Sequence, residues 1–134
     1  MKNALTKAEI NLNDIQIAEL YDQSTFLEMV SLEDLGFSKH GRAWQDVAES
    51  LKEPQRSYRV NGQELYVNTD GGLKADGNPL GATGGAQIYE IVQQLKGEAG
   101  NRQVKIDTEL KYGCALELEG FGTKAYVHFL RRAD

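Results

Sequence analysis

The sequence is poor in the residues that cross-link chains or bind metals. It has one cysteine, Cys114, and two histidines, His40 and His128, among 134 residues. A single cysteine excludes a disulfide within the chain, and these three residues are too few for a structural zinc site, which takes four ligands. Because a chain without disulfides suits a reducing compartment, we expect a cytoplasmic protein.

The sequence also lacks long apolar runs and an excess of positive charge. No apolar stretch approaches the roughly 20 residues that span a bilayer, and the amino terminus has no signal-like apolar core, so we expect no membrane association. With 15 Lys and Arg against 20 Asp and Glu, the net charge is -5. That field repels polyanions, so nucleic acid is not an expected partner.

What is present fits one ordinary globular domain over residues 1–134, with 40% hydrophobic and 26% charged residues. Apolar spacing predicts a mixed α/β architecture. Helices are expected at 4–9, 24–36, 44–51 and 83–97, and strands at 15–20, 66–68, 103–106, 110–118 and 123–130. Residues 40–63, apart from the short helix, are interpreted as a surface excursion.

Two helices have clear sequence signals. Ser24 can cap a helix that Gly36 ends, and its apolar residues are expected to face the core: Phe26, Leu27, Met29, Val30 and Leu35. In the second helix, apolar residues recur at helical spacing before Gly97, a typical stop: Ile88, Ile91, Val92 and Leu95.

Residues 77–85, Gly-Asn-Pro-Leu-Gly-Ala-Thr-Gly-Gly, form a glycine-rich loop that leads into the helix expected from Thr83. Free N–H groups and the helix dipole at such a place favour an anion or a developing oxyanion. The same pattern is also typical of a plain strand-to-helix turn, and composition alone does not choose between the two.

The order of residues 67–84, Val-Asn-Thr-Asp-Gly-Gly-Leu-Lys-Ala-Asp-Gly-Asn-Pro-Leu-Gly-Ala-Thr-Gly, resembles the Asn-x-x-Gly-Gly…Gly-His-Pro-x-Gly-Ala-x-Gly signature of thiolases. Residues 14–22 upstream and Gly120-Phe121-Gly122 downstream follow in the same order as in that family. The resemblance covers nearly the whole chain. It implies a thiolase-like carboxy-terminal half, with helices packed on a mixed sheet.

Thiolases are much longer and have two similar halves, of which the amino-terminal one carries the cysteine that accepts the acyl group. The resemblance therefore implies that this chain lacks that half and an early strand of its own half. We expect a fragment or a subunit that is inactive alone and that needs an amino-terminal thiolase half, with homo-oligomers also possible. The implied substrate is an acyl-CoA thioester, and no further cofactor is expected.

Two positions depart from the family pattern. Asn78 stands where the Gly-His-Pro histidine helps to form an oxyanion hole and to activate the cysteine. Asparagine can donate a hydrogen bond but cannot act as a base near neutral pH, so it is either a remaining oxyanion donor or only a turn residue. Tyr21 stands where thiolases have His or Asn. In this it resembles the steroid side-chain aldolases of the superfamily, which carry tyrosine here as a proton-transfer group. Alternatively, Tyr21 is a half-buried residue at a strand end.

The remaining candidates are weaker. Cys114 lies two residues before the position of the family's second catalytic segment, so it reaches the site only through a bulge or a shifted register, and is otherwise an inert core residue. Glu117 is either a general acid or base or a solvated strand residue. By the resemblance, the substrate-binding backbone positions are Gly77, Pro79, Gly81 and Gly122.

Three functions remain open at this point. The first is acyl transfer with a partner cysteine, as in acetyl-CoA C-acetyltransferase. The second is retro-aldol cleavage of an acyl-CoA with Tyr21 as the proton-transfer group. The third is a non-catalytic scaffold of the same fold, which the loss of the histidine at Asn78 favours.

Overall fold

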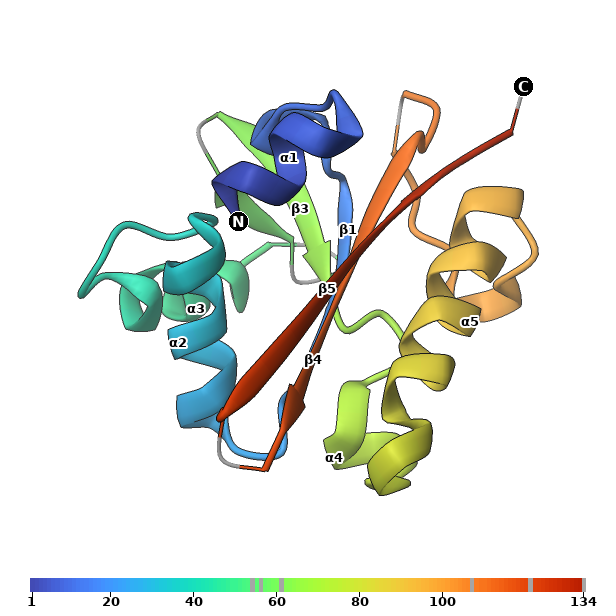
Figure 1. Ribbon diagram of the computed structural model, residues 1–134. Coiled ribbons are helices and arrows are strands. Elements are labelled where there is room, and N and C mark those ends of the chain that lie inside the picture. Colours follow the sequence, from blue (N-terminus) through green and yellow to red (C-terminus); the bar gives the residue numbers. More distant parts are fainter. Residues whose placement is uncertain (54, 56, 61, 107, 121, 134) are drawn as a thin grey trace.

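The computed structural model describes residues 1–134 except 54, 56, 61, 107, 121 and 134. Within that part of the chain, five strands form one mixed sheet in the order β2-β3-β1-β4-β5 (Figure 1). The strands are β1 (Ile17–Leu20), β2 (Tyr58–Val60), β3 (Gln63–Val67), β4 (Tyr112–Glu119) and β5 (Lys124–Arg131). β1 is central and parallel to β3 and β4, whereas β2 and β5 are antiparallel edges. The expected mixed α/β fold is confirmed.

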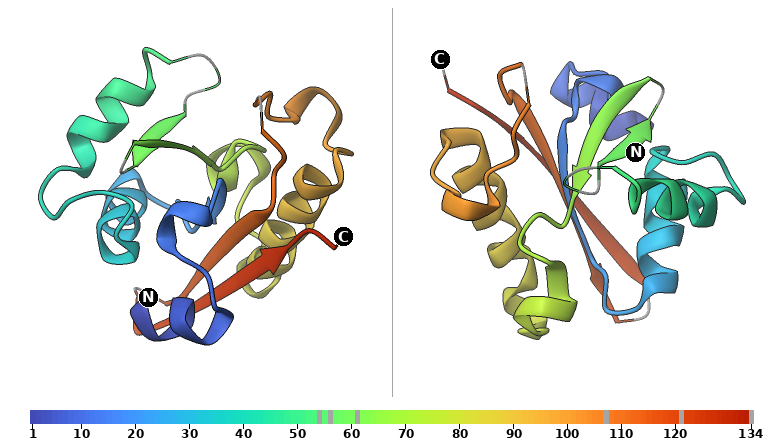
Figure 2. Two further views of the ribbon diagram at one scale, coloured as in Figure 1. Left: turned by 90° about the horizontal axis from the view of Figure 1, so that it is seen from above. Right: turned by 180° about the vertical axis from the view of Figure 1, so that it is seen from behind.

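Helices cover both faces of this sheet (Figures 1 and 2). α1 (Lys2–Ala8), α2 (Thr25–Leu35) and α3 (Ala43–Ser50) lie on one side, and α5 (Thr83–Lys96) lies on the other. The alternation along β1 divides the core accordingly: Ile17 packs with Ile91 of α5, while Leu20 packs with Leu32 of α2. The short helices are η1 (Leu12–Asp14), α4 (Gly72–Asp76), η3 (Leu80–Ala82) and η4 (Gly100–Arg102).

The two helices with clear sequence signals form as predicted. Ser24 Oγ accepts a hydrogen bond from Leu27 N at 3.2 Å, and Gly36 closes α2 in the left-handed conformation. Gly97 closes α5 in the same way. One expectation is wrong, because the side chain of Phe26 is 66% exposed and does not face the core. α2 is apolar on most of its circumference, so sequence alone could not show which side meets the sheet.

Three other elements differ from the sequence prediction. The surface excursion expected up to residue 63 contains β2, which pairs with β3 through Tyr58↔Leu65. Residues 72–76, for which no helix was expected, form α4, whose first residue Gly72 has a positive φ. No strand forms at 103–106; the Gln94 side chain accepts from Val104 N instead of a neighbouring strand. These segments are short, and local contacts outweigh their weak periodicity.

In the described ranges, no helix is long and apolar enough to cross a membrane.

Candidate active site

The site forms where parallel strands end. β1 ends at Leu20, directly before Tyr21, and β3 ends at Val67, from which residues 68–82 lead to the start of α5. β4, parallel to β1, runs toward the same end of the sheet (Figure 1). Ligands of α/β proteins commonly bind outside the carboxyl ends of parallel strands, because loops with free polar groups converge there.

Asn78 and Tyr21 meet at this end, 57 residues apart in sequence. Asn78 Nδ2 donates to Tyr21 Oη at 3.0 Å, and Tyr21 Oη donates to Gln23 Oε1 at 3.3 Å. Asn78 Oδ1 accepts from Leu80 N at 3.0 Å and from Thr83 Oγ1 at 3.2 Å. These contacts fix the amide with its oxygen toward α5 and its nitrogen toward the phenol.

Neighbouring contacts hold the two segments together. Asn68 Oδ1 accepts from Leu20 N at 2.7 Å, which ties the end of β3 to the end of β1. Asp22 Oδ1 accepts from Leu73 N at 2.8 Å, and a Cβ at Gly72 would lie 2.7 Å from Asp22 Cγ. Glycine at residue 72 therefore lets the carboxylate approach the backbone, and the Tyr21 segment stays fixed against α4.

The candidate substrate-binding positions lie in two turns at this end. Gly77, Pro79 and Gly81 are exposed residues on either side of Asn78. Gly122 is exposed in the turn between β4 and β5, has a φ of 87°, and donates its N–H to Glu119 O. Phe121, which completes the Gly-Phe-Gly match, lies outside the described residues. The backbone of these turns is accessible, while the glycines add no side chain that would obstruct a ligand.

The structure places Cys114 apart from the other candidate residues. It pairs in regular register with Ala18 and Phe129, its side chain is 0% exposed, and it packs in the apolar cluster between the sheet and α2. Burial raises the pKa of the Cys114 thiol to about 12. No bulge or register shift brings it toward Tyr21. Glu117 of β4 lies instead on the α5 side, with its carboxylate against Gly84.

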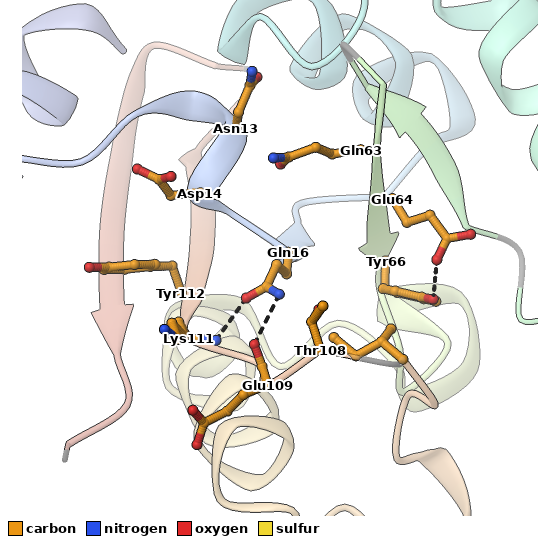
Figure 3. Close-up of a pocket in the computed structure, with 11 residues that line it drawn as sticks. Asn13, Asp14, Gln16, Gln63, Glu64, Tyr66, Thr108, Glu109, Lys111 and Tyr112 are labelled. Atoms are coloured by element: carbon orange, nitrogen blue, oxygen red, sulfur yellow. Dashed lines mark hydrogen bonds between the residues drawn. The ribbon is translucent and has the colours of Figure 1, made fainter.

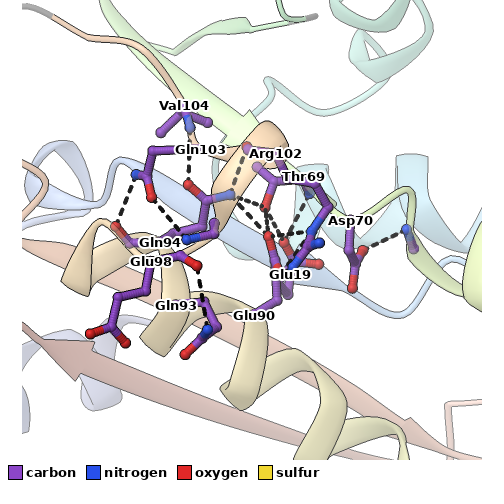
Figure 4. A network of polar contacts seen from close by, with 12 residues as sticks. Glu19, Thr69, Asp70, Glu90, Gln93, Gln94, Glu98, Arg102, Gln103 and Val104 are labelled. Carbon is purple, nitrogen blue, oxygen red and sulfur yellow. Dashed lines mark hydrogen bonds and ion pairs between the residues drawn. The ribbon is translucent and has the colours of Figure 1, made fainter.

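A buried polar network next to the site was not predicted from the sequence (Figure 4). It joins Glu19 of β1, Thr69 after β3, Glu90 and Gln94 of α5, and Arg102 of η4. The helical spacing of Glu90 and Gln94, which places both on one face of α5, was the available signal.

A large groove lies at the opposite end of the sheet (Figure 3). Its volume is about 790 Å³, and polar residues including Gln16, Glu64, Glu109 and Lys111 line it. The Gln16 side chain holds the segment that leads into β4, donating to Glu109 O and accepting from Lys111 N. Among the residues with a described placement, no group of three or more His, Cys, Asp or Glu side chains could hold a metal ion.

The family described as thiolase C-terminal domain-like matches residues 1–132. An acetyl-CoA acetyltransferase of Methanothermobacter thermautotrophicus is 37% identical over 131 residues, which are 98% of this chain and 32% of that protein. An acetyl-CoA acetyltransferase of Methanocaldococcus jannaschii is 33% identical over 129 residues, 96% of this chain and 32% of that protein.

Sterol carrier protein 2 of Homo sapiens is 39% identical over 98 residues, 73% of this chain and 17% of that protein. This chain therefore belongs to the thiolase C-terminal domain-like family. It spans about a third of the length of the acetyl-CoA acetyltransferases that it matches.

Proposed function

We propose that this chain is the carboxy-terminal portion of a thiolase-type acyl-CoA acyltransferase, similar to acetyl-CoA acetyltransferase. In this proposal an amino-terminal thiolase half supplies the nucleophilic cysteine, and the substrate is a coenzyme A thioester. The single observation that carries the proposal is the contact of Asn78 Nδ2 with Tyr21 Oη at 3.0 Å. It joins the two altered motif positions into one polar pair at the carboxyl ends of the strands.

The pair can supply hydrogen bonds to a reacting carbonyl. The Asn78 amide nitrogen carries two hydrogens, and the contact with Tyr21 uses one of them. The second can be donated to a thioester oxygen as negative charge develops on it, which is the action of an oxyanion hole. Because Leu80 N and Thr83 Oγ1 hold the amide oxygen, the donor needs little reorganisation during the reaction.

The nucleophile must come from outside this chain. A thiolate, not a thiol, attacks a thioester, and a thiol whose pKa is about 12 is almost entirely protonated at neutral pH. Cys114 is also enclosed in the core and has no access to Asn78. Catalysis by acyl transfer therefore requires a second cysteine on a partner.

The outward face of α5 is the surface on which we expect that partner. Gly85 and Ala86, in the first turn of the helix, are exposed and add at most a methyl group to its surface. Tyr89, one turn further on, is 62% exposed. Small residues allow close approach of another backbone, and an exposed aromatic side chain is typical of interface anchors. Alternatively, a second copy of this chain binds the same face and forms a homo-oligomer.

The experiment is reconstitution with the candidate amino-terminal half, followed by an acetoacetyl-CoA thiolysis assay. Asn78→Ala should lower kcat by about 10²–10³, the usual loss for one oxyanion-hole donor, with little change in complex formation. The control Asn3→Ala, on the exposed side of α1, should leave the rate unchanged. Unchanged activity in Asn78→Ala would contradict the oxyanion role.

A second candidate function is retro-aldol cleavage of an acyl-CoA. It is favoured by the phenol of Tyr21, which accepts from Asn78 and donates to Gln23 and so already lies in a proton-transferring arrangement. Tyr21→Phe should then abolish cleavage with ligand binding intact, and the control Tyr126→Phe on β5 should not. If Tyr21→Phe and Asn78→Ala both leave activity unchanged, the chain is a scaffold.

A further inference from the structure

Thr69 Oγ1 lies between two buried carboxyl groups (Figure 4). It is 3.0 Å from Glu19 Oε1 and 3.0 Å from Glu90 Oε1, and it accepts from Gln94 Nε2 at 3.2 Å. Glu19 and Glu90 are each only 2% exposed. Two acidic side chains from different elements therefore share one hydroxyl in the interior of the protein.

Counting hydrogens limits the charge of this cluster. A threonine hydroxyl has one hydrogen to donate, so it can serve one carboxylate only. The second oxygen–oxygen contact of 3.0 Å is a hydrogen bond only if that carboxyl group itself carries a proton. Otherwise two carboxylates would meet across a single hydroxyl hydrogen in the interior, where burial and their mutual repulsion both oppose a second negative charge. One of the two glutamates must therefore be neutral.

Glu90 is the ionised member of the pair. Arg102 donates to it through Nη2 at 2.7 Å and through Nε at 3.2 Å, and Gln94 Nε2 adds a third donor at 2.9 Å. Burial raises the pKa of Glu90, but the hydrogen bonds from Arg102, Gln94 and Thr69 together outweigh it and keep the pKa below its ordinary value. Thr69 accordingly donates its hydrogen to Glu90.

Among the residues that the structure describes, no cation is paired with Glu19 in this way. Its Oε1 accepts from Thr69 N at 2.9 Å, and the charged groups near it are Asp70 beside Thr69, Asp76 of α4 and Glu90 of α5, with Arg102 already paired to Glu90. Glu117 of β4 lies two residues beyond Ala115, the register partner of Glu19. Burial raises the pKa of Glu19 well above its usual range, and the negative charges of Asp70 and Glu90 raise it further, against the hydrogen bond from Thr69 N.

We propose that Glu19 keeps its proton in the folded protein and donates it to Thr69 Oγ1, which in turn donates to Glu90. This makes Glu19 a positioning residue. Its neutral carboxyl group holds Thr69 through both hydroxyl and backbone N–H, at the start of the segment that carries Asn78. The inference rests on the proposed function only for the role of Asn78; the protonation itself does not depend on it.

A small cavity lies next to Glu19, behind the loop that carries Asn78. It has a volume of about 120 Å³ and is lined by Glu19, Thr83, Pro79 and Gln87 among others. Gln87 Nε2 donates to Leu116 O at 3.0 Å, while the buried Oε1 has no hydrogen-bond partner. The described residues that line the cavity therefore provide an acceptor but no cation that would stabilise an ionised Glu19.

We expect the contact between protonated Glu19 and Thr69 to make the stability of the folded protein depend on pH. Unfolded glutamate ionises near its ordinary value of 4.5, whereas folded Glu19 keeps its proton to a higher pH. The stabilisation is thus complete below that ordinary value and is lost as the pH rises through the pKa of folded Glu19. Over that range the equilibrium constant of unfolding increases by up to about tenfold per pH unit. Glu19→Gln, which mimics the neutral acid with an amide donor, should remove this slope.

The test is urea unfolding of the full chain between pH 5 and pH 9, for wild type, Glu19→Gln and the control Glu49→Gln. Glu49 is a surface residue paired with Lys52, so its substitution should leave the wild-type pH profile unchanged. We expect Glu19→Gln to gain stability relative to wild type as pH rises. Parallel profiles for wild type and Glu19→Gln would overturn the proposal.

A second measurement covers the case in which Glu19→Gln does not fold. The carboxyl carbon of Glu19 is followed in the wild-type chain by NMR titration, with Glu90 as internal reference. The proposal expects Glu19 at the chemical shift of a protonated acid at pH 7 and Glu90 at that of a carboxylate. An ionised Glu19 at pH 7 would refute it. Since neither measurement uses acyl-CoA or a partner, both are independent of the proposed function.

Discussion

Gly72→Ala is the substitution whose effect follows most directly from the geometry near the site. Gly72 has a φ of 64°, a conformation that costs a residue with a Cβ about 1–2 kcal/mol. The added Cβ would also lie 2.7 Å from Asp22 Cγ and Oδ1, and the carboxylate could leave only by giving up its hydrogen bond to Leu73 N. A bond to a charged group contributes about 1.5–3 kcal/mol, so the total loss is about 2.5–5 kcal/mol.

The assay is urea unfolding, with Gly85→Ala as the matched control. A Cβ at Gly85 meets nothing within 4 Å, so the helix preference of alanine should stabilise α5 by about 1 kcal/mol. In the double variant with Asp22→Ala, the collision is absent, and Gly72→Ala should cost only the backbone strain. A loss below about 1 kcal/mol for Gly72→Ala with Asp22 present would refute the reasoning, since strain alone reaches that value.

Three other substitutions or reactions test the structure. Ser24→Ala removes the cap of α2 and should cost about 1 kcal/mol in thermal unfolding, whereas Ser24→Asp should be nearly neutral. Cys114 should react with iodoacetamide at pH 8 only after unfolding, and rapid labelling of the native chain would contradict its burial. Hydrogen bonds from Gly41 N and Ala43 N lower the pKa of Glu33, so Glu33→Gln should destabilise the chain near neutral pH. That difference should vanish on acidification through the folded pKa, and urea midpoints at several pH values would show whether it does.

The helices with strong local signals were predictable. Ser24 begins α2 and Gly36 ends it, as expected, and Gly97 ends α5. These residues were predictable because caps act through contacts within one turn. β2 was missed because a three-residue strand carries almost no periodicity, and it forms only by pairing with β3. The outward position of Phe26 depends on which side of α2 meets the sheet, which is a tertiary property.

The candidate site was predictable only as far as its motif extends. The sequence pattern indicated Asn78 and Tyr21 together, and the structure shows their side chains in contact. The Glu19–Thr69–Glu90 cluster could not be predicted from the sequence, because its members come from β1, the turn after β3 and α5, which meet only in the folded protein. Whether Asn78, Tyr21 and the turn glycines act on a substrate stays a prediction for the experiments above.

The proposed function requires that this chain provide one half of an acyl-CoA site whose cysteine lies on a partner. Native mass spectrometry of the chain purified from its source organism tests it most directly. We expect a hetero-complex of fixed stoichiometry with a longer thiolase-like polypeptide, which becomes acylated on the partner's cysteine when acetyl-CoA is added. A chain found only by itself or with its own copies, with no acylated partner, would contradict the claim.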